Sequence, residues 1–203
     1  MEALKYLAVI LIAYLLGSVS VAVVITKYIM KKDVREQGSG NAGATNVARV
    51  FGMRLGVLTL LGDCAKTALS MLIGHLFLGY YGLLLGAAAC FIGHMWPIYF
   101  RFKGGKGIAV GGAAALILDY RMFLIVLAVF ALVFVLFRIV SAASISAAAM
   151  YPVAMLILGV RDPYTLALGL FFGISAILLH RKNIVLLIQG KEKKFRPGGG
   201  KNS

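Results

Sequence analysis

Long apolar runs, separated by short polar and basic segments, dominate this chain. A helix that spans a bilayer needs about 20 predominantly apolar residues. Seven runs qualify as candidates, with soft boundaries, at residues 4–29, 53–76, 81–98, 106–120, 121–140, 144–160 and 163–180. The fourth run is short and Gly-rich at its start, so we expect it to begin in a loop buried in protein, where irregular backbone is tolerated at membrane depth. The pattern predicts an all-α, polytopic membrane protein with about seven transmembrane helices.

The composition agrees with a lipid environment. Hydrophobic residues make up 61% of the 203 positions and charged residues only 14%, whereas a soluble domain is usually about 25% charged. A domain near this length still leaves about a quarter to a third of its surface exposed, so a soluble fold has no place for so much apolar surface. We therefore expect a single transmembrane domain over residues 1–195, followed by a flexible tail or an expression remnant at residues 196–203.

The distribution of basic residues predicts the orientation of the helices. The formal net charge is +14, and 17 of the 21 Lys and Arg residues fall in segments that the predicted spans place on one side. The positive-inside rule makes that side cytoplasmic, which puts the N-terminus outside and the C-terminus inside. Because these charges lie between apolar runs, we expect them to contact anionic membrane lipids, and we expect no nucleic-acid partner.

The segment Gly38–Gly52, between the first two apolar runs, is the first candidate for chemistry. Three glycines within six residues permit close backbone approach and positive φ angles. Short hydrogen-bonding side chains are supplied by Ser39, Asn41, Thr45 and Asn46. Arg49 adds a guanidinium group suited to bidentate binding of phosphate or carboxylate, and the stretch around it is able to start a helix whose free N–H groups favour an anion. The alternative is an ordinary flexible polar loop.

A second Gly-rich stretch, Gly93–Gly112, carries the residues Lys103, Gly104, Gly105, Lys106 and Gly107. These offer successive backbone N–H groups flanked by two ammonium groups, a composition that suits a phosphate-binding nest. The spacing and the Mg²⁺-binding hydroxyl of a P-loop are missing, and the alternative is a basic cytoplasmic turn with glycines for its geometry. His94 precedes Trp96 and Pro97, and we expect it to have an interfacial role at a helix end rather than a catalytic one.

Two further polar groups stand at the predicted cytoplasmic ends of later runs. Arg138, Ser141 and Ser144 have spacings of three and six, which put them on one face of a helix. Serine in membranes more often packs helices than does chemistry, so helix packing and direct substrate contact are both open for the two serines. His180 and Asn183, three residues apart, share a face at the end of the last run, where they are candidates for binding a hydroxyl or a phosphate oxygen.

Ionisable residues inside an apolar run need an explanation of their own. Asp63 and Lys66 lie three apart within the second run, and either a function in the membrane or a structural pair that neutralises itself explains them. Neither Asp63 nor Glu192 has a clustered carboxylate partner in the sequence. We therefore predict no metal site and no cofactor.

Three motifs stand in order along nearly the whole chain: GSGNAGATN with a following arginine, GHxxPxxFxFKGGKG and HRxNIxxLxxGxExK. Together they resemble the bacterial acyl-phosphate:glycerol-3-phosphate acyltransferase family. The resemblance implies a multi-pass enzyme of the bacterial inner membrane, with one catalytic domain and an active site that faces the cytoplasm. It implies transfer of an acyl group from acyl phosphate to the 1-hydroxyl of glycerol-3-phosphate, which gives lysophosphatidic acid and inorganic phosphate without a cofactor.

The resemblance also points to site residues. It matches Ser39 and Arg49 to essential positions of the first motif, and it matches members of the second and third motifs to substrate binding and catalysis. The predicted catalytic residues are Ser39, Arg49, His180 and Asn183. The predicted substrate-binding residues are Asn41, Thr45, Asn46, Lys103, Gly104, Gly105, Lys106, Gly107, Ser141, Ser144 and Glu192. One departure from the family pattern is that residues 185–188 are wholly apolar where a basic residue is expected.

We expect direct acyl transfer without an acyl-serine, because phosphate is a good leaving group and no G-x-S-x-G elbow surrounds Ser39. No histidine is followed five residues later by aspartate, so the HxxxxD chemistry of other acyltransferases is unavailable. The proton acceptor stays open between His180 and a substrate phosphate oxygen. The alternative function is a transporter or channel for a phosphorylated metabolite. Such a protein needs polar groups that continue to the outer face, where the predicted loops are short and poor in them. The oligomeric state is left open.

Overall fold

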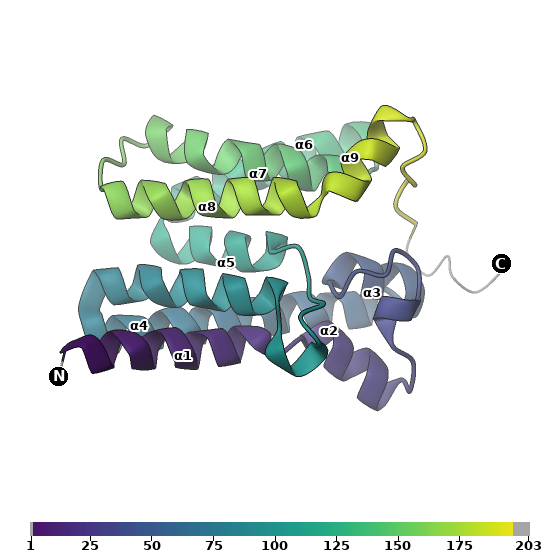
Figure 1. Ribbon diagram of the computed structural model, residues 1–203. Helices are drawn as coiled ribbons and strands as arrows, with labels where there is room; N and C mark the ends of the chain where they lie inside the picture. Colours follow the sequence, from purple (N-terminus) through teal and green to yellow (C-terminus); the bar gives the residue numbers. More distant parts are fainter. Residues whose placement is uncertain (1, 197–203) are drawn as a thin grey trace. The chain divides into compact units, whose positions relative to one another are not determined.

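The computed structural model describes residues 2–196, and every regular element in this part of the chain is a helix (Figure 1). This confirms the all-α prediction. The helices form two compact units: one holds the chain as far as Val110, and the other runs from Gly111 to Phe195. The predicted tail, residues 196–203, lies outside the described residues beyond its first position. That the chain acts as a single catalytic domain stays a prediction.

The first unit contains both glycine-rich loops and the helices that carry them. Its elements are α1 (Glu2–Ser18), α2 (Val21–Val23), the π-helical η1 (Val24–Ile29), η2 (Val34–Glu36), α3 (Ala44–Phe51), α4 (Met53–Met95) and η3 (Ile98–Phe100). Helix α1 packs along α4. The predicted run 4–29 is helical but interrupted between α1 and α2, where the hydroxyl of Ser20 accepts the Val23 N–H at 3.4 Å and caps the second helix.

The 43-residue helix α4 folds back on itself at Gly79. Gly79 has φ 63° and ψ −145°, a conformation that is essentially open to glycine alone. A Cβ atom on Gly74 would overlap the carbonyl of Gly82, and one on Gly86 would overlap the carbonyl of Ser70, so the two legs touch backbone to backbone. The second and third predicted runs are therefore separate helices joined by a turn, as expected.

The second unit is built from consecutive helices. Its elements are α5 (Ile108–Leu118), which starts in the first unit, α6 (Tyr120–Phe137), α7 (Val140–Ile157), α8 (Pro163–Leu179) and α9 (Arg181–Ile188). Helix α7 packs against both α6 and α8. Aspartates begin two of these helices: Asp119 accepts the Arg121 N–H at 2.8 Å, and Asp162 accepts the Thr165 N–H at 2.8 Å. These caps allow short connections between long helices.

Four helical segments are long and apolar enough to cross a bilayer: Glu2–Ile29, Met53–Phe100, Tyr120–Phe137 and Val140–Ile157. Met53–Phe100 is counted here as one segment, although it contains both legs of α4 and the turn at Gly79. The pair α8 and α9, bent by 58°, adds a fifth if it counts as one span. Helix α5 has 11 residues, and at 1.5 Å per residue it extends only about 16 Å, roughly half of a hydrocarbon core. A crossing by all seven predicted runs and the orientation of the termini stay predictions.

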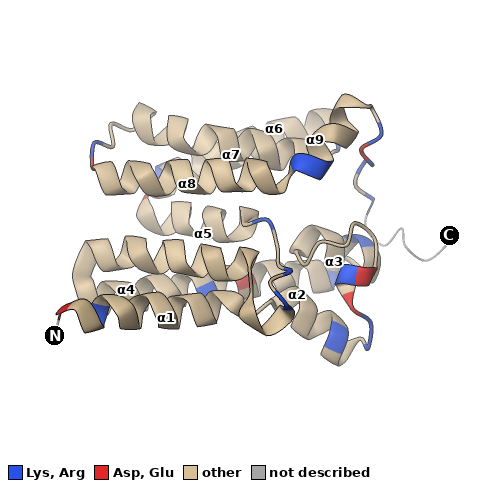
Figure 2. Cartoon of the chain, in the orientation of Figure 1, with Lys and Arg blue, Asp and Glu red and all other residues tan. Residues whose placement is uncertain are grey.

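The helix surfaces fit a lipid solvent. Charged residues are sparse along the helices and gather in the segments that connect them (Figure 2). Large apolar side chains are exposed instead, and Leu76 and Val135 are each 72% exposed. A soluble monomer rarely presents continuous apolar surface on this scale, whereas in a bilayer such surface needs no cover.

Candidate active site

The first glycine-rich loop is organised around the buried side chain of Asn46, which is 1% exposed. Its Nδ2 lies 3.0, 2.9 and 3.1 Å from the carbonyls of Val34, Gln37 and Asn41, which share its two N–H donors. Its Oδ1 accepts the backbone N–H of Ser39 at 3.0 Å. Asn46 was predicted to bind substrate, but these contacts use both ends of its amide within the loop. These hydrogen bonds hold the loop backbone at Ser39 and Asn41 in one conformation.

Arg49 lies one turn further along α3. Its Nε is buried and has no hydrogen-bond partner among the described residues. A buried donor left without a partner costs about 1–3 kcal/mol. Thr45 stands half-buried in the first turn of the same helix, and the Gly43 N-cap provides no side-chain hydrogen bond to that turn. The helix start and the guanidinium therefore both suit an anion.

The second glycine-rich loop packs on His94, at the end of α4. The Gly105 N–H donates to the His94 carbonyl at 3.1 Å. A Cβ atom on Gly105 would overlap the His94 ring and lie 3.2 Å from the Ala42 carbonyl of the first loop, while one on Gly104 would overlap the His94 carbonyl. Gly107 has φ +81° and sits against the ring of Phe91. The glycines are thus required for close packing, and Gly105 allows the second loop to approach the Ala42 carbonyl of the first loop.

Two lysines flank this glycine turn. Lys103 is exposed and Lys106 is half-buried. Apolar residues from both loops, Ala42, Val47 and Phe100, share one buried cluster beneath them. Within the first unit, the structure therefore brings together the two segments that were each predicted to bind phosphate.

A buried polar cluster of Asp63, Lys66 and His94 lies next to the second loop, which it contacts through His94. The Lys66 ammonium lies 2.9 Å from Asp63 Oδ1 and 3.1 Å from His94 Nδ1, and the Asp63 carboxylate lies 3.5 Å from the same nitrogen. Lys66 Nζ also donates to the carbonyls of Gly17 and Val19 at 2.9 and 2.8 Å, at the end of α1. We expected His94 to have an interfacial role, but its ring is 5% exposed within this cluster. The contacts favour the structural explanation of Asp63 and Lys66.

In the second unit, Glu192 is hydrogen-bonded to two other predicted site residues. Its Oε1 accepts a hydrogen bond from the Ser141 hydroxyl at 2.6 Å and another from the Asn183 amide at 2.8 Å. Ser144 is buried on the same helix as Ser141. Glu192 is thus hydrogen-bonded to Ser141 and Asn183, and its binding of substrate stays a prediction.

His180 ends α8 and is 4% exposed. Its Nδ1 lies 2.7 Å from the Ala176 carbonyl. A carbonyl only accepts hydrogen bonds, so this contact places a proton on Nδ1. In the neutral ring the acceptor nitrogen is then Nε2, as a general base requires.

Comparison with known proteins decides the family. The family model described as glycerol-3-phosphate acyltransferase matches residues 7–190. The chain belongs to this family. The glycerol-3-phosphate acyltransferase of Syntrophotalea carbinolica is 41% identical over 194 residues, which is 95% of this chain and 98% of that protein. The enzyme of the same name from Clostridioides difficile is 39% identical over 201 residues, which is 96% of this chain and 98% of that protein.

Solved structures agree with the family assignment. The chain resembles PlsY (YgiH), an integral membrane glycerol 3-phosphate acyltransferase, in its glycerol 3-phosphate form, with a TM-score of 0.88 and 35% identity over 94% of this chain and 96% of that chain. The lysophosphatidic acid form of PlsY matches with a TM-score of 0.85 and 34% identity over 94% of this chain and 95% of that chain. The predicted resemblance is confirmed, and the glycerol-3-phosphate acyltransferase fold is that of an integral membrane protein.

Sequence reasoning missed two residues of this member of the glycerol-3-phosphate acyltransferase family. Asp33 and Arg35 form an ion pair at 2.7 Å just before the first loop, and Arg35 also reaches the Phe100 carbonyl. The available signal was an Asp-x-Arg spacing directly ahead of the GSGN motif, which is short and common. Only the structure shows what the guanidinium touches.

Proposed function

We propose that this protein transfers an acyl group from acyl phosphate to the 1-hydroxyl of glycerol-3-phosphate, giving lysophosphatidic acid and inorganic phosphate. The reaction takes place at the cytoplasmic face of a bacterial inner membrane, at the start of phospholipid synthesis. The family match supports the acceptor and the reaction class, and the relative solved in glycerol 3-phosphate and lysophosphatidic acid forms supports the substrate and the product. The observation that carries the proposal on this chain is the buried, unpartnered Nε of Arg49.

Arg49 and the Lys103–Gly107 loop share the binding of substrate phosphate in this proposal. A phosphate oxygen supplies the acceptor that Arg49 Nε lacks among the described residues. The second loop adds backbone N–H groups and two lysines, and a Cβ atom on its Gly105 would lie 3.2 Å from the Ala42 carbonyl of the first loop. Both substrates carry phosphate, so an anion site at these loops serves binding and charge stabilisation together.

The chemical step is a direct displacement. The oxygen of the glycerol 1-hydroxyl attacks the carbonyl carbon of the acyl phosphate, a new C–O ester bond forms, and the bond from that carbon to the phosphate oxygen breaks. Inorganic phosphate leaves with the electron pair of the broken bond. The hydroxyl proton passes to Nε2 of His180, whose Nδ1 proton is held by the Ala176 carbonyl at 2.7 Å. Ser39 acts by hydrogen bonding, and no acyl-serine forms.

The test uses the purified protein in lipid with acyl phosphate and glycerol-3-phosphate, scored for lysophosphatidic acid and free phosphate in equal amounts. Parallel reactions contain acyl-CoA or acyl-carrier protein as donor, and each is run with Mg²⁺ and with a chelator. We expect product from acyl phosphate in both metal conditions. Product from acyl-CoA alone would overturn the donor, and no acylation of glycerol-3-phosphate by any donor would overturn the activity.

A matched pair of arginine variants tests the observation that carries the proposal. Arg49→Met removes the buried guanidinium, and we expect kcat/KM to fall by about ten- to a hundredfold because a charge-assisted contact to phosphate is lost. Arg54→Met removes an exposed arginine from the first turn of α4, and we expect a change within about twofold. Equal activity of the two variants would remove Arg49 from the site.

A further inference from the structure

The turn of residues 33–36, immediately before the first glycine-rich loop, holds an unusually well-bonded arginine. Arg35 Nη2 and Nε donate to the Asp33 carboxylate at 2.7 and 3.0 Å, and the same carboxylate accepts the Arg35 backbone N–H at 2.9 Å. Both side chains are largely buried, with 19% and 9% of the Arg35 and Asp33 side chains exposed. A guanidinium held in this way has little rotamer freedom left.

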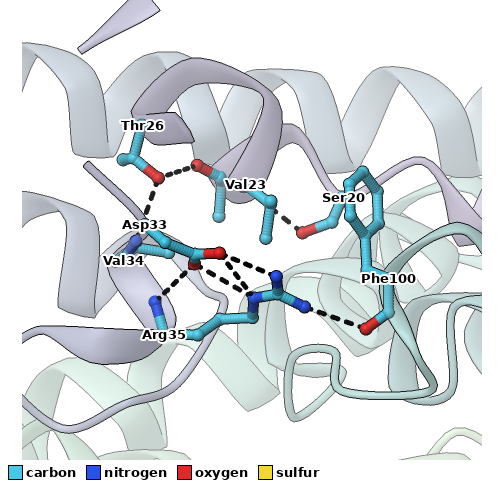
Figure 3. A network of polar contacts seen from close by, with 8 residues as sticks. Ser20, Val23, Thr26, Asp33, Val34, Arg35 and Phe100 are labelled. Atoms are coloured by element: carbon cyan, nitrogen blue, oxygen red, sulfur yellow. Dashed lines mark hydrogen bonds and ion pairs between the residues drawn. The ribbon is translucent and has the colours of Figure 1, made fainter. Parts of the chain in front are cut away.

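The remaining arm of the guanidinium reaches the second loop. Arg35 Nη1 donates to the Phe100 carbonyl at 2.8 Å, and the guanidinium carbon lies 5.8 Å from the centre of the Phe100 ring (Figure 3). The same carbonyl accepts the backbone N–H of Lys103 at 3.3 Å. One oxygen atom therefore joins Arg35 to the first residue of the Lys103–Gly107 turn.

The segment between these contacts is strained. Arg101 and Phe102 both have φ of 57°, in the left-handed region that residues other than glycine avoid. Such residues cost roughly 1–3 kcal/mol each and persist where the surroundings over-determine them. Arg35 fixes the carbonyl directly before this pair, so it helps to hold the chain in the conformation that delivers Lys103.

The same turn is fixed to the first loop. The Val34 carbonyl accepts the Asn46 amide at 3.0 Å. The Val34 N–H donates to the Thr26 hydroxyl at 3.2 Å (Figure 3), and that hydroxyl donates to the Ala22 carbonyl. Val34 is completely buried. One short turn is thus bonded to the first loop through Val34 and to the second loop through Arg35.

We propose that Arg35 is a positioning residue for substrate phosphate, which sets the place of the Lys103–Gly107 turn relative to the first glycine-rich loop. The inference rests on the proposed function, because it takes that turn to bind the phosphate of glycerol-3-phosphate. Arg35 touches no reacting atom in this account. Its effect belongs to substrate affinity, and it reaches the substrate through the Phe100 carbonyl and the backbone of Lys103.

The chain contains a matched control. Asp119 and Arg121 form a second Asp-x-Arg pair with nearly the same geometry: Nη2 to Oδ2 is 2.7 Å, Nε to Oδ1 is 3.1 Å and the backbone N–H to Oδ1 is 2.8 Å. This pair is more exposed, and within residues 2–196 the Arg121 side chain donates hydrogen bonds to Asp119 alone. The two arginines therefore differ in exposure and in the contact to Phe100, and the contact is the feature that the comparison tests.

The test compares Arg35→Met with Arg121→Met in the full-length protein in lipid. We expect Arg35→Met to raise KM for glycerol-3-phosphate by about tenfold or more, with a smaller change in kcat, and to weaken binding of glycerol-3-phosphate by a similar factor when no acyl donor is present. Arg121→Met is expected to change KM by less than about twofold. An Arg35→Met protein that stays folded with a wild-type KM would overturn the proposal.

A conservative variant keeps the test open if Arg35→Met fails to fold. Arg35→Lys retains a charge and single donors but loses the fork that serves Asp33 and Phe100 at once, so a raised KM with a thermal midpoint near that of the wild type supports positioning. If Arg35→Met misfolds and Arg35→Lys has a wild-type KM, the Asp33–Arg35 pair only stabilises the fold, and the positioning role is overturned. If the wild-type protein itself binds no glycerol-3-phosphate, the proposed function fails rather than the role of Arg35.

Discussion

Asp33 lies outside the membrane-spanning helices, and its pKa depends on its contact with Arg35. Hydrogen bonds from the Arg35 side chain lower the pKa of Asp33 from its ordinary value of 3.8, against an opposing effect of burial. A pKa that is lower in the folded than in the unfolded protein adds stability above the ordinary value. That stability is lost as the pH falls through the lower, folded value.

The Asp33→Asn variant tests this dependence. Near neutral pH we expect the variant to unfold about 1 kcal/mol more easily than the wild type, because a partly buried, charge-assisted pair is lost. The difference should shrink as the pH drops below about 4, where the wild-type carboxylate also becomes neutral. Chemical unfolding in detergent at several pH values measures it. A difference that stayed constant or grew toward acid would contradict the assignment.

For single residues, the sequence indicated which side chains suit an anion site but did not indicate their hydrogen-bond partners. The Gly-rich loops with Arg49, Lys103 and Lys106 could be predicted to bind an anion because the residue types that suit an anion lie close together in the sequence. The inward roles of Asn46 and Glu192 could not, since Asn46 bonds to a carbonyl 12 residues away and Glu192 to a hydroxyl 51 residues away. Contacts over such separations depend on the fold and leave no trace in a motif.

Among the elements, the turn within α4 rests on a single glycine. Gly79 has a positive φ, and a Cβ atom there would meet nothing within 4 Å. The cost of Gly79→Ala is therefore a backbone cost, and we expect about 1–3 kcal/mol of lost stability. Gly112 in α5 also has open space, but its φ is not positive, so Gly112→Ala should be neutral or stabilise by up to about 1 kcal/mol.

Thermal unfolding of Gly79→Ala and Gly112→Ala side by side separates backbone strain from a general effect of added methyl groups. A midpoint for Gly79→Ala that matched the wild type would mean that the two legs of α4 do not need this glycine.

The apolar pattern predicted where helices lie but not where they break. All seven runs contain helix, and the gap between runs two and three contains the reversal at Gly79. The break between α1 and α2 was missed, because the buried Ser18 and Ser20 sit among apolar residues and barely lower the hydropathy of the run. The fourth run is already short in the sequence and was predicted to begin in a loop; α5 has 11 residues and begins at Ile108, directly after the glycine-rich turn.

For the whole molecule, the orientation in the membrane is the main outstanding prediction. In a background without Cys64 and Cys90, we expect Glu2→Cys to react with an impermeant maleimide on right-side-out vesicles. Lys193→Cys should react only after the vesicles are opened, because the positive-inside rule places the basic C-terminal segment in the cytoplasm. Both positions are exposed. Labelling in the reverse order would invert the topology and move the proposed site to the outer face.

The family and the all-α architecture were within reach of the sequence because three spaced motifs and long apolar runs are global signals. The way helices α1 and α4 join was not. Backbone contacts at Gly17 and Gly93 and the four partners of the Lys66 ammonium depend on which helix faces meet. The hydropathy of a segment does not indicate which side of its helix packs against a neighbouring helix, so these contacts are seen only in the folded structure.

The cluster around Lys66 bears on how the chain is inserted during synthesis. A lone lysine costs about 2.5–3.5 kcal/mol at the centre of an inserting helix. Asp63 arrives on the same turn, and the Gly17 and Val19 carbonyls belong to a segment that leaves the ribosome earlier. When Lys66 reaches the translocon, the residues that accept its hydrogen bonds, Asp63, Gly17 and Val19, have therefore already been synthesised. A circular permutant that delivered α1 last would remove that advantage, and its yield in membranes would measure it.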